Sequence, residues 1–188
     1  MIPENTNYLK LFEERLEQTL LKQCKERGIL EGKLLSTPDI DECWMAFAPD
    51  YLANAVPEIA KYPLVALGWA MFLGMAVGKL WDTDWNQYGK NPEEIYRQLR
   101  DKRGFDCMDE YILEEVLRLN ADAARQLTGH VQHCAQTVET AIRKEEVEPS
   151  TPLAFNIFTT SINVLYRLGA AIELHALGYR FERIDPKA

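Results

Sequence analysis

The chain has 188 residues, of which 47% are hydrophobic and 27% charged, a balance typical of one globular domain and not of a disordered chain. Twenty-one Lys and Arg residues against 29 Asp and Glu residues give a net charge of −8. This acidic balance disfavours nucleic acids and anionic membranes as partners, because both are bound by clustered cations. We therefore expect residues 1–188 to form a single domain.

Helix signals follow one another from the N-terminus. A first helix is predicted to begin at Asn5 or Thr6 and to end near Gly28, because apolar residues recur along one side and Gly28 follows a cationic last turn. The run 37–39 (Thr-Pro-Asp) has the cap, the first-turn proline and the acid that start a helix.

Two prolines interrupt the pattern that follows. Pro49 and Pro57 lie inside residues 38–61, and a proline removes a backbone donor and clashes with the preceding turn of a helix. We expect these prolines to divide the segment into short helices.

The most apolar segment covers residues 63–81 and carries no charge from 63 to 78. Ala70, Gly74 and Gly78 form a face of small residues that would suit a transmembrane dimer. The uncharged run is shorter than the roughly 20 residues that a span needs. We therefore predict a central core helix, with no membrane, whose glycines let another helix backbone approach closely.

Three further helices complete the pattern. Asn91 and Pro92 start one that ends near Gly104; a second runs from about 106 to 146 with a break near Asn120 or Gly129; the last runs from 151 to about 179. Apolar residues recur at steps of three and four in the last two, and their connection is short, which indicates an antiparallel hairpin. No segment alternates with period two. The predicted fold is all-α, a bundle of about five to seven helices around residues 63–81.

The four cysteines, Cys24, Cys43, Cys107 and Cys134, are far apart and form no CxxC pair. In a chain able to build its own core, this pattern is typical of buried thiols in a reducing compartment. The first residues contain no basic region followed by an apolar stretch, so we expect no secretion signal and a cytoplasmic location.

A loop is predicted over residues 81–90, and it is the candidate functional surface. It offers aromatic and acidic side chains, which suit a ligand or a protein partner on a rigidly anchored loop. The alternative is that these side chains only cover the open end of the bundle. The candidate residues are Trp81, Asp82, Asp84, Trp85 and Tyr88.

Metal and catalytic patterns are weak. His175 falls on the inner seam of its helix, whereas His133 should face solvent and His130 lies to one side, so we predict no metal site formed by the three histidines and no cofactor. A site of two histidines that recruits Asp or Glu stays open. Glu13, Glu14 and Glu17 have the EExxE spacing that helical nucleotide pyrophosphohydrolases use for magnesium, but the second acidic motif of those enzymes is missing downstream. No phosphate-binding loop or nucleophile motif appears.

These patterns favour a non-catalytic module for protein interaction or self-association, most simply a two-fold homodimer. They assign no catalytic residue and leave open whether the protein is an enzyme. The alternative is a metal-dependent hydrolase that uses a carboxylate cluster inside the bundle, drawn from Glu14, Glu17, Asp82, Asp84, Asp109 and Glu110.

Overall fold

The computed structural model describes residues 3–180, and all of its regular secondary structure over that range is helical. The long helices are α1 (Pro3–Glu26), α2 (Pro38–Glu58), α3 (Pro63–Tyr88), α6 (Ala121–Lys144) and α7 (Pro152–Ala176). Shorter elements join them: α4 (Pro92–Asp101), a 3₁₀ turn (Phe105–Cys107), α5 (Met108–Tyr111) and a π-helical turn (Ile112–Val116). The predicted all-α bundle is confirmed.

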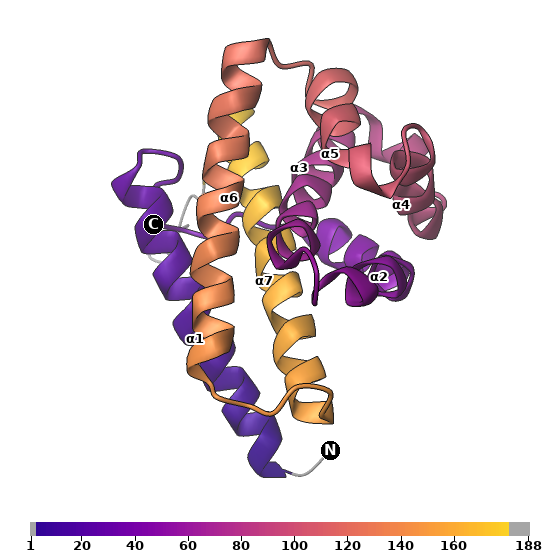
Figure 1. Ribbon diagram of the computed structural model, residues 1–188. Helices are drawn as coiled ribbons and strands as arrows, with labels where there is room; N and C mark the ends of the chain where they lie inside the picture. Colours follow the sequence, from indigo (N-terminus) through magenta and orange to yellow (C-terminus); the bar gives the residue numbers. More distant parts are fainter. Residues whose placement is uncertain (1–2, 181–188) are drawn as a thin grey trace, which may run out of the picture.

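In Figure 1, α6 and α7 run antiparallel through the middle of the molecule, with α1 on one side and α2 and α4 on the other. The short connection 145–151 joins α6 to α7, as the predicted hairpin requires. The closest partner of α7, however, is α3.

The contact between α3 and α7 depends on two glycines. A Cβ atom at Gly74 would overlap the carbonyl oxygen of Tyr166, and one at Gly169 would overlap the carbonyl oxygen of Met71. Each helix thus presses its backbone onto the other at a position that has no side chain. The predicted close approach at Gly74 is confirmed.

Helix α3 is buried from Ala66 to Gly78 except at Trp69, because its neighbours surround it. By length and composition alone α3 could cross a membrane, with a mean hydropathy of 1.6 in its most apolar window. That window is 67% buried inside the protein, which is typical of a core helix.

Helix α2 is continuous through Pro49 and Pro57, so the prediction that they break it was wrong. Its inner face carries Trp44, Phe47 and Tyr51, all buried. Trp44 stacks on Tyr166 of α7 with ring centroids 4.7 Å apart. This aromatic packing holds the helix together against the loss of two backbone hydrogen bonds.

The caps follow the sequence closely. Thr37, Asn120 and Thr151 each accept a hydrogen bond from the backbone amide three residues on, at 3.4, 2.9 and 3.2 Å. The break predicted near Asn120 is therefore real, whereas Gly129 lies inside α6. Asn91 precedes α4 but its side chain makes no cap bond.

Candidate functional site

The five predicted site residues do not lie on a loop. Helix α3 continues to Tyr88 with a kink at Asp84, where φ is −165° and ψ is 81°. The loop prediction was wrong because the chain meets no glycine or proline until Gly89. The Asp84 carboxylate also accepts a hydrogen bond from the amide of Gln87 (3.2 Å), which restarts the helix as an N-cap would.

Trp81 and Asp82 are engaged in contacts inside the molecule. The Trp81 indole donates to the Asp39 carboxylate at the start of α2 (3.0 Å), and its ring meets that of Tyr179 at a centroid distance of 5.5 Å. The Tyr179 hydroxyl donates to Asp82 (2.7 Å). These two residues therefore connect the end of α3 to α2 and to the chain after α7.

Trp85 and Tyr88 make contacts other than those of Trp81 and Asp82. A Cβ atom at Gly89 would lie 2.6 Å from the Trp85 indole, so this ring covers the end of α3. Tyr88 lines a hollow of about 440 Å³ together with Lys79 and Lys102. The five residues do not converge on one surface. Their role in binding stays a prediction, and their contacts favour a structural role.

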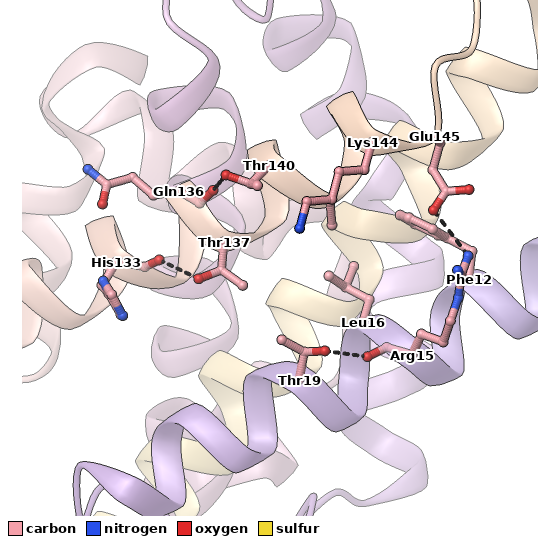
Figure 2. A pocket seen from close by; sticks show the side chains of 11 residues that line it. Phe12, Arg15, Leu16, Thr19, His133, Gln136, Thr137, Thr140, Lys144 and Glu145 are labelled. Carbon is pink, nitrogen blue, oxygen red and sulfur yellow. Dashed lines mark hydrogen bonds and ion pairs between the residues drawn. The ribbon is translucent and has the colours of Figure 1, made fainter.

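A larger hollow of about 560 Å³ lies between α1 and α6, and we call it the α1/α6 groove. Figure 2 shows its lining from close by, with the polar side chains of α6 above those of α1. Apolar side chains form its floor, and charged and hydroxyl groups line its walls. The lining consists of Phe12, Arg15, Leu16, Thr19, His133, Gln136, Thr137, Thr140, Ala141, Lys144 and Glu145.

The α1/α6 groove has more cationic than anionic side chains. Its one carboxylate, Glu145, accepts hydrogen bonds from Arg15 (3.0 Å) and from the Tyr8 hydroxyl. Burial, together with that hydrogen bond, raises the pKa of Tyr8 to about 12. Lys144 has no ion pair with any residue from 5 to 180, whose side chains the structure describes, and Figure 2 shows its ammonium group over the groove. One end of the groove is therefore cationic in a protein whose net charge is −8.

The three histidines do not converge on one site. His130 is 3.4 Å from the Arg27 guanidinium, and burial together with that cation lowers its pKa. His133 lines the α1/α6 groove, and His175 lies 3.9 Å from the Glu31 carboxylate. Within residues 3–180, no three His, Cys, Asp or Glu side chains come close enough to hold a metal ion.

The EExxE glutamates serve the packing of α1. Glu13 and Glu17 both pair with Arg167 of α7, at 3.4 and 3.2 Å. Glu14 faces outwards, 4.0 Å from Lys10. The structure thus gives this spacing a role in joining α1 to α7, and the hydrolase alternative gains no geometric support.

The outer face of α2 is apolar and uncharged over residues 45–57. Met45 is 75% exposed and Val56 is 38% exposed, and Pro49 and Leu52 continue the same stripe at helical spacing. Asp50, the one charged residue in this range, is turned towards α4, where it pairs with Arg97 at 2.8 Å. We call this stripe the α2 outer face.

Comparison with models of known protein families, with curated proteins and with solved structures finds no match for this chain.

Proposed function

We propose that the protein acts by binding and that it self-associates as a two-fold dimer through the α2 outer face. The observation that carries this proposal is Met45, a large apolar side chain that is 75% exposed at the N-terminal end of the uncharged α2 outer face. Contiguous exposed apolar surface on a folded protein is typical of an interaction site.

The charges at the two ends of α2 favour a second copy of this chain as the partner. Asp41 and Glu42 lie at the N-terminal end and Lys61 just beyond the C-terminal end, and all three are exposed. An antiparallel pairing centred near residue 51 sets Glu42 of each copy beside Lys61 of the other. With that centre Met45 faces residue 57, next to Val56, so apolar groups meet in the middle and opposite charges at the ends.

The stripe is short. Residues 45–57 of a helix span about 18 Å. Such a patch buries less area than a standard stable interface, so we expect a dimer with a dissociation constant in the micromolar range, on the order of 1–10 µM.

Light scattering across a concentration series tests the dimer. The wild-type protein should exceed its monomer mass of 21.6 kDa at tens of micromolar. Met45→Glu should remain a monomer there, because two buried carboxylates would face the apolar stripe. The matched control is Leu11→Glu on α1, a residue 51% exposed and away from α2, which should leave the dimer intact. A wild-type monomer at this concentration would refute the proposal.

Charge reversal tests the register. Lys61→Glu places like charges together at both ends and should weaken the dimer roughly tenfold. Adding Glu42→Lys to the same chain restores opposite charges and should recover most of the affinity. Equal affinity in all three proteins would mean that the copies pair in another register.

A second candidate function rests on the α1/α6 groove. An apolar floor beside the unpaired Lys144 and the Arg15 guanidinium suits a small anion with an apolar tail. Decanoate is a suitable probe, and calorimetric titration should show binding that Lys144→Glu weakens. Decyltrimethylammonium, with the same tail and the opposite charge, is the matched control. Equal binding of both probes would contradict a charge-selective site.

A further inference from the structure

Helices α1 and α6 run antiparallel, and polar pairs fix their register. Arg15 pairs with Glu145 at 3.0 Å, and the Thr137 hydroxyl donates to Gln23 at 2.9 Å. Further along, Arg27 lies 3.4 Å from His130. Each step towards the end of α1 is therefore matched by a step towards the start of α6.

This register sets Cys24 opposite Cys134. Both lie between the last two polar pairs, Gln23 with Thr137 and Arg27 with His130. Cys24 is 0% exposed and Cys134 is 2% exposed, so both thiols are inside the same core.

The two thiols are close enough to affect each other's protonation. The neighbouring Cys134 thiol lowers the pKa of Cys24, and the Arg27 guanidinium acts in the same direction. The same contact, together with burial, raises the pKa of Cys134. Between the two sulfurs, the negative charge is therefore favoured on Cys24. Cys43 contrasts with this pair, because burial raises its pKa to about 12.

We propose that Cys24 and Cys134 are a modification site at which a hydroperoxide forms a reversible disulfide between α1 and α6. The Cys24 thiolate attacks one peroxide oxygen, the O–O bond breaks, and hydroxide leaves, giving a sulfenic acid. The Cys134 sulfur then attacks the Cys24 sulfur, and the sulfenic oxygen leaves as water with the Cys134 proton. Two thiols and one hydrogen peroxide thus give one disulfide and two waters, and a low-mass thiol reverses the reaction.

Two features of the fold suit this chemistry. The α1/α6 groove is lined by His133 and Thr137, on the turns of α6 beside Cys134, and both thiols are buried below it, so an oxidant reaches them only when α1 moves locally away from α6. Cys24 lies in the last turn of α1, where a helix backbone adjusts most easily. Access for a small oxidant such as hydrogen peroxide is therefore easier than for a protein disulfide.

The bond would close a loop of more than 100 residues. Constraining so long a loop in the unfolded chain raises the melting temperature by on the order of 10 °C for a protein of this size. The oxidised protein should therefore be more stable than the reduced one.

Peptide mapping of the full chain tests the proposal. The folded protein is treated with hydrogen peroxide, remaining thiols are blocked with N-ethylmaleimide, and the digest is analysed by mass spectrometry. We expect a peptide pair joined through Cys24 and Cys134, a mass lower by two hydrogen atoms, a higher melting temperature, and reversal by dithiothreitol. Free or overoxidised thiols at these two positions, without the joined peptides, would overturn the proposal.

Variants separate this pair from the other thiols. Cys24→Ser and Cys134→Ser should each abolish the intramolecular disulfide, whereas the matched controls Cys43→Ser and Cys107→Ser should retain it. An intramolecular disulfide that survives in Cys24→Ser would overturn the assignment. If a variant fails to fold, the peptide map of the oxidised wild-type protein still decides whether Cys24 and Cys134 are joined.

Discussion

Gly74→Ala is the most direct test of the α3–α7 contact. The added methyl group would meet the carbonyl of Tyr166 and the amide of Ala170, which are backbone atoms and cannot rotate away. Overpacking of this kind costs about 3 kcal/mol, because the two helices have to separate. Replacing glycine by alanine in a helix gains about 1 kcal/mol. The net loss is about 2 kcal/mol, or a melting temperature lower by roughly 4–8 °C.

Gly129→Ala is the matched control. Gly129 also lies inside a long helix, but nothing lies within 4 Å of a Cβ atom built there. Only the gain in helix propensity remains, so this variant should melt roughly 2–4 °C higher than the wild type. Thermal unfolding followed by far-UV circular dichroism measures both. The reasoning is refuted if Gly74→Ala melts at or above the wild-type temperature while Gly129→Ala behaves as expected.

Three further variants test individual contacts. Burial raises the pKa of Glu173, so this carboxyl group holds its proton more tightly in the folded protein than in the unfolded chain. The stability of the protein therefore falls as the pH rises from the pKa of the unfolded chain to that of the folded protein. Glu173→Gln should therefore melt higher at neutral pH but not in acid, and a difference independent of pH would contradict this. Tyr166→Phe removes the hydroxyl that donates to the carbonyl of Ile40 and should cost about 0.5–1.5 kcal/mol in denaturant unfolding, so an unchanged stability would count against that bond. Asp82→Ala combined with Asp84→Ala should lower the melting temperature by a few degrees, because each carboxylate accepts a local hydrogen bond. Light scattering should show the same dimer mass as for the wild type. Loss of the dimer would indicate that these two residues belong to a binding surface.

Local signals predicted most helix starts, because a cap depends on residues that are near in sequence. Thr37 and Thr151 each combine a hydroxyl with a following proline, and both helices begin where this pair predicts. The spacing of small residues in the apolar segment likewise predicted the close approach at Gly74, since only a backbone needs that space.

The prolines of α2 show where local reasoning fails. Pro49 has no amide hydrogen to donate to the carbonyl of Met45, but that carbonyl lies on the exposed side, where water can satisfy it. On the opposite side, Phe47 and Tyr51 are buried against the core. Tertiary packing of α2 therefore outweighs the tendency of Pro49 to interrupt a helix.

The grooves and the thiol pair could not be predicted because they depend on which helices lie side by side. No spacing in the sequence indicates that α1 faces α6, and so Arg15 and Lys144, or Cys24 and Cys134, had no visible relation. The contacts of residues 81–88 inside the molecule could not be predicted for the same reason. Their partners, Asp39 and Tyr179, lie about 40 and 100 residues away.

The pairing of α3 with α7 also means that α3 is synthesised well before the helix that packs against it. Gly169 follows Gly74 by about 95 residues, which a ribosome adds in roughly 5–20 s. During that interval the most apolar helix of the protein has left the ribosome without the helix that covers it. Its apolar surface is exposed during this interval, so slow elongation should favour aggregation more in this protein than in one whose core forms from neighbouring helices.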